Sequence, residues 1–401
     1  MARAIHLARG RIHAYLHPRL TALERVGEAT MKWDLEGRPV SGQWENVYYR
    51  RGISHAVMAR SRLERAGRIL PGGEAAAALD HFHRLAKEAG GALSGFEGEE
   101  GAELRGRLAG IRAAGPEALE RDAARFRAVY RPVPILPPDR VLSFVVQATE
   151  GCSWNRCSFC GLYPDREFRV RDEEDVERHL RGALDLFGRS ILLRRGLFLG
   201  DGDPFAVPDE RLLPVVDRIL AILAERERKG GPLPRSREIF AFARLRSLTA
   251  GGGRDLRPYS ARGFRRLYVG IETGDEELYR LLRKPGSLAS LPEARGRMAE
   301  AGIAAGLIFL VGVGGERYRD AHREGCVRLL APLDLGPDDL VFLSPFRTVP
   351  GTDYAAWAER EGIRPMGREE MHDEAREMAL ALHRAGVRAK AAYYPLEHFV
   401  Y

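Results

Sequence analysis

Beyond residue 139, short apolar segments alternate with segments of helical pattern, and this alternation limits the possible folds more than any other feature. The apolar segments are rich in β-branched and aromatic residues, and we predict strands at 141–146, 197–199, 239–242, 267–271, 306–311 and 340–343. Strands that alternate with helices form a parallel sheet through right-handed crossovers. Six such units are fewer than the eight of a closed barrel, so we predict an α/β fold with a partial (β/α)6 TIM-like barrel.

The proline-rich segment 131–138 divides the chain into two parts. It cannot continue a helix, so we place the barrel directly after it, at residues 139–352. In front of it, segments with apolar residues at helical spacing predominate. We therefore expect residues 1–138 to form a mainly helical N-terminal region of unknown role, and residues 353–401 to form a short C-terminal helical and aromatic extension.

An aromatic segment of the N-terminal region, residues 31–51, holds Trp33 and Trp44 beside paired tyrosines. Such a segment is too aromatic for a free linker. Packing of the N-terminal region on the main domain is favoured over ligand binding by this segment. Because six strands leave a barrel open at its side, we also hypothesise that residues 1–130 help to close a substrate chamber.

Three of the four cysteines, Cys152, Cys157 and Cys160, follow the first predicted strand in a C-x4-C-x2-C spacing. Loops at the carboxyl ends of strands are where α/β folds keep their chemistry. Thiolates at such spacings converge on one metal centre, and three without a fourth favour a four-iron cluster with one open iron. A two-iron centre would need Cys326, which lies in a predicted helix and is more typical of a buried hydrophobe. Zinc would need a fourth ligand, and no histidine lies near; both alternatives stay open.

Two further loops carry polar groups at the ends of predicted strands. Residues 200–203, Gly-Asp-Gly-Asp, follow the second strand, and their glycines let the backbone approach a ligand closely. Carbonyl and carboxylate oxygens there suit an ammonium group, although a plain turn is the alternative. Glu272 ends the fourth strand and can accept hydrogen bonds from a hydroxyl or an amine.

Together these motifs resemble the radical S-adenosylmethionine (SAM) superfamily. The cysteine triad with Phe159 before its last member, and the glycine-rich loop, have the expected positions. Residues 268–274 and 350–352 resemble motifs of the subgroup that contains oxygen-independent coproporphyrinogen oxidase and the elongator catalytic subunit. One departure is the first gap, which holds four residues where the family usually has three.

The resemblance implies a [4Fe–4S] cluster on the three cysteines, with SAM chelating the open iron. By this resemblance, the loop after the second strand would hold the amino group of SAM, and Glu272 would contact its methionine or ribose part. The loop after the third strand would make polar contacts. Phe159 and the end of the fifth strand would flank the adenine. The residues so assigned are Phe159, Gly200, Asp201, Gly202, Arg244, Ser247, Glu272, Val311 and Gly312.

As a function, the resemblance implies an oxygen-sensitive enzyme that reductively cleaves SAM to methionine and a 5′-deoxyadenosyl radical, which abstracts hydrogen from a substrate. A small molecule is favoured, because neither an RNA-binding module nor extra cysteine clusters accompany the barrel. Action on RNA or a peptide, methyl or aminocarboxypropyl transfer, and a non-catalytic iron–sulfur carrier are the alternatives. The expected partners are SAM and a flavodoxin- or ferredoxin-type electron donor.

Charge and hydropathy bound these expectations. The chain has 63 basic and 56 acidic residues, which indicates a surface of mixed charge. Such a surface is compatible with nucleic-acid binding but does not favour it. No apolar run is long enough to span a membrane, and the N-terminus has no signal-peptide pattern. We therefore expect a cytoplasmic protein.

Overall fold

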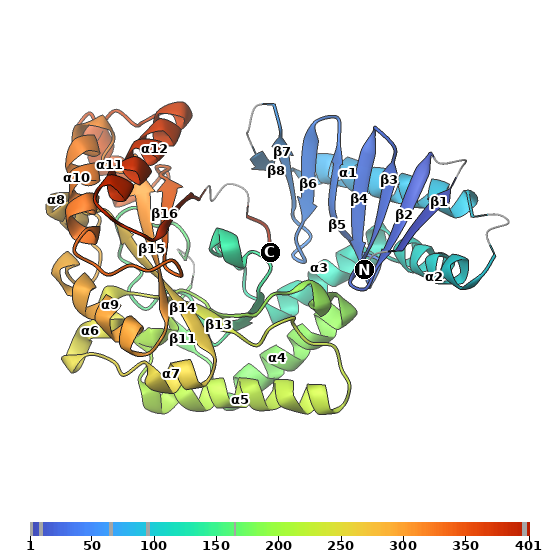
Figure 1. Cartoon of the computed structure of the whole chain (residues 1–401), viewed down its shortest axis with the longest axis horizontal. Coiled ribbons are helices and arrows are strands. Elements are labelled where there is room, and N and C mark those ends of the chain that lie inside the picture. Colours follow the sequence, from blue (N-terminus) through green and yellow to red (C-terminus); the bar gives the residue numbers. More distant parts are fainter. Residues whose placement is uncertain (1–2, 8–10, 64–66, 94–96, 164–165, 395–398) are drawn as a thin grey trace.

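The computed structural model describes residues 3–7, 11–63, 67–93, 97–163, 166–394 and 399–401. Figure 1 shows the N-terminal sheet, in blue, on one side and a larger α/β domain, in green to red, on the other. The C-terminus lies between the two. None of the described helices is long and apolar enough to cross a membrane.

A parallel sheet forms the centre of the larger domain. Its strands are β9 (Phe144–Gln147), β12 (Leu197–Gly200), β13 (Ile239–Ala243), β14 (Phe264–Glu272), β15 (Ala304–Val311), β16 (Leu340–Pro345) and β17 (Lys390–Tyr393). Neighbours are parallel throughout, in the order β17-β16-β15-β14-β13-β12-β9. The predicted α/β partial barrel is confirmed, and the C-terminal extension adds β17 as a seventh strand.

Helices connect these strands and cover the sheet (Figure 1). They are α4 (Glu173–Phe187), α5 (Asp209–Arg228), α6 (Leu245–Thr249), α7 (Arg257–Ala261), α8 (Glu276–Leu281), α9 (Leu291–Glu300), α10 (Arg319–Leu330), α11 (Asp353–Arg360) and α12 (Arg368–Arg384). Helix α4 begins where the sequence predicts, because the Asp172 carboxylate accepts a hydrogen bond from the Asp175 amide at 2.8 Å. Its apolar stripe, which includes Val176 and Leu180, is fully buried.

At β9, the open edge of the sheet, side chains form hydrogen bonds with the backbone groups that have no neighbouring strand. The Val145 amide donates to the Tyr401 hydroxyl at 2.8 Å, and the Val145 carbonyl accepts from the Tyr130 hydroxyl at 2.8 Å. Further along, the Gln147 amide donates to Nε2 of His179 at 3.0 Å. An unpaired backbone group inside a protein is costly, so these three side chains replace the neighbouring strand that a closed barrel would supply.

The prediction of a mainly helical N-terminal region is wrong. It contains an eight-stranded antiparallel sheet in sequential order, followed by three helices. The strands are β1 (Arg3–Leu7), β2 (Ile12–His17), β3 (Leu20–Arg25), β4 (Ala29–Asp34), β5 (Pro39–Trp44), β6 (Val47–Arg51), β7 (Val57–Ser61) and β8 (Gly67–Ile69), and the helices are α1 (Gly72–Gly91), α2 (Glu99–Ala113) and α3 (Pro116–Val129). In β2, buried Ile12, Ala14 and Leu16 alternate with half-buried polar residues. This period of two was hidden because the outward residues of β2, His13, Tyr15 and His17, are long amphipathic side chains.

The aromatic segment with Trp33 and Trp44 lies in β4, β5 and β6. Trp33 is fully buried and its ring meets that of Phe82 of α1 edge to face, with centroids 5.7 Å apart. The segment therefore packs the N-terminal domain onto its own helix. The same segment also contacts the barrel, through the buried Arg38, which donates to the carbonyls of Leu186 and Phe187 at the end of α4.

Candidate active site

A cavity of about 180 Å³ lies at the carboxyl ends of the parallel strands. Seven of the predicted site residues line it: Cys152, Phe159, Cys157, Cys160, Gly202, Arg244 and Glu272. Its other lining residues include Phe242, Tyr268, Lys284, Ile308, Leu310 and Tyr394. Residues far apart in the sequence, such as Cys152 and Lys284, thus meet in one site because parallel strands end at one edge of the sheet.

The cysteine loop is anchored to the turn that follows α8. Ser158 donates through its amide to the Leu282 carbonyl at 3.1 Å and through its hydroxyl to the Leu281 carbonyl at 2.8 Å. The indole N–H of Trp154 donates to the Arg283 carbonyl at 2.8 Å. Asn155, inside the four-residue gap, has a φ of 43°, in the left-handed region that asparagine tolerates better than most residues. This residue lets the longer gap turn back toward the second cysteine.

The three cysteine thiols of the loop are free and half-buried. Burial raises the pKa of Cys157 to about 11 and also raises the pKa of Cys160. Thiolates in such a place need a bound cation, and soft iron is suited to them. The fourth cysteine, Cys326, is buried in α10, where its Sγ lies 4.0 Å from the imidazole of His322, and it does not line the cavity.

The donor set fits a [4Fe–4S] cluster. Three thiols on one loop face the cavity, and none of the described residues around it adds a fourth thiol or a histidine. Among the described residues, no three His, Cys, Asp or Glu side chains are grouped as the ligands of one metal ion. The thiolates of a four-iron cluster bind separate iron atoms, so they are spread over the cluster and do not meet at a single point.

Glu272 and Lys284 form an ion pair inside the cavity. Nζ of Lys284 donates to Oε1 of Glu272 at 2.8 Å, and both side chains are only about a tenth exposed. Burial alone would lower the pKa of Lys284, but the Glu272 carboxylate and the Cys157 thiol oppose this and raise it above its ordinary value. Glu272 has a φ of 69°, at a register shift between β14 and β15. Left-handed backbone at a non-glycine residue is costly and clusters at functional sites.

Lys284 was missed by the sequence analysis. A signal was available, since it is one of five lysines among 63 basic residues in a chain that otherwise uses arginine. Lysine presents a compact ammonium with freely rotating donors, and arginine presents a rigid planar fork. Each of the few lysines in an arginine-rich chain is therefore a candidate for a special position.

Asp201 supports the start of the cysteine loop through hydrogen bonds. Its carboxylate accepts from the side-chain amide of Gln147 at 3.0 Å and from the Gly151 amide at 3.3 Å. Burial raises the pKa of Asp201 to about 6, although these hydrogen bonds oppose the shift. Neither Gly200 nor Asp201 lines the cavity, so of the predicted glycine-rich loop only Gly202 reaches it. A Cβ on Gly202 would lie 3.0 Å from the Gly151 carbonyl oxygen, so the loop needs glycine there.

Arg244 and Ser247 both bind Asp203. Nε of Arg244 and the Ser247 hydroxyl donate to Oδ2 of Asp203 at 2.7 and 2.5 Å. Oδ1 of Asp203 is buried and has no hydrogen-bond partner among the described residues. Ser247 does not line the cavity, and Arg244 does. Asp203, in the predicted loop 200–203 but not among the predicted site residues, thus holds Arg244 and Ser247 together.

Val311 and Gly312, the predicted adenine neighbours, do not line the cavity, whereas Ile308 and Leu310 do. Successive side chains of a strand point to opposite faces, so Ile308 and Leu310 face the cavity and Val311 faces the helical layer. Gly312 lies against Met371 of α12. The side chains that flank the cavity are therefore offset by one position from those predicted, and a backbone contact stays a prediction.

Comparison with known families concerns the segment that carries the cysteine loop. Residues 146–324 match the model of the Radical SAM superfamily. This segment is a radical SAM domain. Its members are enzymes, and the [4Fe–4S] cluster and SAM that we predict are the cofactors of the superfamily. No curated protein sequence matches the chain.

Several solved structures are similar to the chain, all at low identity. Coproporphyrinogen III oxidase (HemN) from Escherichia coli is 18% identical, with 66% of this chain and 56% of that chain covered and a TM-score of 0.39. Methylornithine synthase (PylB) is 18% identical, with 76% and 81% covered and a TM-score of 0.38. The cobalamin-dependent SAM radical enzyme OxsB is 13% identical, with 61% and 36% covered and a TM-score of 0.36. The chain thus spans little more than a third of OxsB, and likeness at these TM-scores carries no argument about function.

The N-terminal sheet lies outside the cavity of the radical SAM domain. The described residues that line this cavity begin at Ile135, in the segment that joins the two domains. The hypothesis that residues 1–130 close a substrate chamber therefore gains no support from the lining of the cavity. The boundaries at 139 and 352 stay predictions, although the change from antiparallel to parallel sheet falls between β8 and β9.

Proposed function

We propose that this protein is a radical SAM enzyme that acts on a small molecule. Reductive cleavage of SAM at the cluster would give methionine and a 5′-deoxyadenosyl radical able to take hydrogen from that substrate. The observation that carries the proposal is the convergence of Cys152, Cys157 and Cys160 with the buried Glu272–Lys284 pair in one cavity at the carboxyl ends of the strands.

The residues of the cavity have separate roles in this proposal. The three cysteines would hold three irons, and the close approach of backbone at Gly202 would leave room for the amino group of SAM beside the fourth. The Glu272 carboxylate would accept hydrogen bonds from the methionine or ribose part, and Lys284 would hold that carboxylate in its orientation. Arg244 would act by fixing Asp203.

The lining of the cavity supports a small substrate. Part of the lining is formed by Phe242, Ile308, Leu310 and Tyr394, which are apolar or present aromatic rings. The hydroxyl of Tyr394 is turned away, toward the Leu136 carbonyl. An apolar wall excludes water from reactive intermediates, which suits a substrate small enough to be enclosed beside the cofactor.

Product analysis tests this proposal. Anaerobically reconstituted protein should hold about four irons and, with dithionite and SAM, release 5′-deoxyadenosine. Cys157→Ala should lose both the cluster and this product, because it removes a thiolate ligand. Cys326→Ala, the matched control, should keep both. Release of methylthioadenosine alone would refute hydrogen abstraction and favour aminocarboxypropyl transfer.

The electron donor belongs to the proposal as well. Cys157 and Cys160 also line an outer groove of about 760 Å³, together with Arg156, Arg283 and Asp353. Arg156 is exposed and has no acidic partner among the described residues. A flavodoxin- or ferredoxin-type carrier with an acidic surface would dock there, close to the cluster. If so, Arg156→Glu should slow turnover driven by flavodoxin and leave turnover driven by dithionite unchanged; equal effects on both would contradict this docking site.

A cytoplasmic location stays a prediction.

A further inference from the structure

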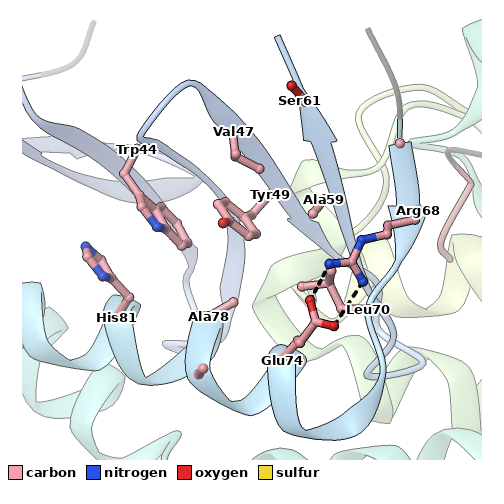
Figure 2. Close-up of a pocket in the computed structure, with 12 residues that line it drawn as sticks. Trp44, Val47, Tyr49, Ala59, Ser61, Arg68, Leu70, Glu74, Ala78 and His81 are labelled. Carbon is pink, nitrogen blue, oxygen red and sulfur yellow. Dashed lines mark hydrogen bonds and ion pairs between the residues drawn. The ribbon is translucent and has the colours of Figure 1, made fainter. Parts of the chain in front are cut away.

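A second cavity, of about 430 Å³, lies in the N-terminal domain, and the radical SAM site makes no use of it. Figure 2 shows it between the end of the antiparallel sheet and the first half of α1. Its walls are formed by strands β5 to β8 on one side and the helix on the other. The volume is within the range of ordinary small-molecule sites.

The cavity exists because α1 has small residues at positions where large side chains would fill the space against the sheet. The helix contributes Glu74, Ala77, Ala78 and His81, which lie three or four positions apart and therefore on one face. One turn later, Phe82 and Leu85 fill the space against the sheet and are almost completely buried. Small side chains on one turn and large ones on the next leave a cavity of defined shape.

A stack of aromatic rings ends at this cavity. The imidazole of His81 is parallel to the indole of Trp44, with centroids 4.6 Å apart and an angle of 1°. On the other side of the indole lies the ring of Tyr49, at 3.8 Å and 9° (Figure 2). Among the described residues, no further ring pairs with Tyr49. The stack can therefore be extended by one more planar ring, placed in the cavity against Tyr49.

An ion pair borders the cavity across from this stack. Both terminal nitrogens of Arg68 donate to the carboxylate oxygens of Glu74, and Figure 2 shows the pair facing the cavity beyond Tyr49. The side chains are 59% and 50% exposed. Such an exposed pair adds little to stability, so either partner can turn to a ligand at small cost. The site thus offers one cation and one anion side by side.

We propose that this cavity binds a zwitterionic aromatic compound, of which an aromatic α-amino acid is the simplest form. The ring would stack on Tyr49, the carboxylate would bind the planar fork of Arg68, and the ammonium would bind Glu74. Arginine is suited to a carboxylate because its two N–H groups match the two oxygens. The proposal gives the N-terminal domain a recognition role separate from SAM cleavage.

Calorimetric titration of the full-length, cluster-containing protein tests the proposal, without SAM or reductant. The probes are L-tryptophan, L-tyrosine, L-phenylalanine and L-kynurenine; L-leucine lacks the ring, and indole-3-propionate lacks the ammonium. At least one aromatic amino acid should bind, and the two comparison compounds should bind at least tenfold more weakly. Failure of all four aromatic amino acids to bind would overturn the proposal.

Variants locate the binding to this cavity. Arg68→Ala removes the cation from an exposed position, and Ala78→Leu fills the cavity from the helix; each should weaken binding at least tenfold. Arg60→Ala is the matched control, because Arg60 is exposed on β7 between the lining residues Ala59 and Ser61 and so points to the opposite face. Unchanged binding by folded Arg68→Ala protein, or equal loss with Arg60→Ala, would overturn the proposal. Since no SAM is present, the outcome is independent of the proposed enzyme activity.

Discussion

His179 should make the stability of the protein depend on pH. It lies on α4, where Nε2 accepts the Gln147 amide and Nδ1 lies 2.9 Å from the Val129 carbonyl. Burial, assisted by the charge of Arg171, lowers the pKa of His179 to about 3. The imidazole is therefore neutral in the folded protein, with the proton on Nδ1, and a second proton would break the bond to β9.

The direction and size of the effect follow from proton linkage. In the unfolded chain this histidine takes up a proton near its ordinary pKa of 6.5, and in the folded protein only near 3. The unfolded state thus binds more protons between these values, so stability is complete above pH 6.5 and falls as the pH falls. From pH 8 to pH 5.5 the loss from this one group is about 1.4 kcal/mol. His322, whose pKa burial lowers to about 4, loses a similar amount.

The variant His179→Gln isolates the contribution of His179. A glutamine can accept from the Gln147 amide and donate to the Val129 carbonyl, but it does not titrate. Urea unfolding, followed anaerobically by circular dichroism at pH 8 and pH 5.5, gives the free energy of unfolding of both proteins. Between the two pH values the variant should lose about 1.4 kcal/mol less than the native protein. Equal losses in the two proteins would refute the assignment of a buried, neutral His179.

Further expectations concern the active site and the core. Glu272→Gln should raise the KM for SAM at least tenfold and leave the iron content unchanged. The control Glu276→Gln, at an exposed position of α8, should leave the KM unaltered. An unchanged KM in Glu272→Gln would contradict a contact between Glu272 and the cofactor. Tyr401→Phe should cost about 1–3 kcal/mol and lower the Tm by several degrees, because the Val145 amide loses its acceptor; Tyr48→Phe, 36% exposed, should not. Trp33→Ala should cost about 3–5 kcal/mol by opening the core of the N-terminal domain, and a Tm like that of the native protein would contradict its packing role.

The parallel sheet and the cysteine centre could be predicted from the sequence because both depend on patterns within short segments. A strand such as β15, buried on both faces, is a continuous apolar run, and the carboxylate that caps α4 directly precedes it. The three cysteines lie within nine residues, so their spacing alone places them on one loop. Patterns of this length do not depend on how distant segments meet.

The N-terminal sheet shows where local patterns fail. Its strands are five or six residues long for the most part, and their outer faces carry long charged side chains that also suit helices. Each strand is stable only through its neighbours, and the pairing of β4 with β5 or of β6 with β7 appears in the contacts between strands and in no single segment. Short segments of this kind are therefore ambiguous until the sheet is assembled.

The details of the active site were decided by tertiary structure. Lys284 meets Glu272 because the chain turns after α8, and Arg244 meets Asp203 because the ends of β12 and β13 are neighbours. Tyr401 reaches β9 across 256 positions of sequence. The sequence by itself predicted the strand that ends at Glu272, the strands that precede Asp203 and Arg244, and a metal centre on the three cysteines. Which side chains face one another depended on the packing of elements far apart in the chain, because the free energy of an ion pair or a buried hydrogen bond exists only once both partners have been brought together.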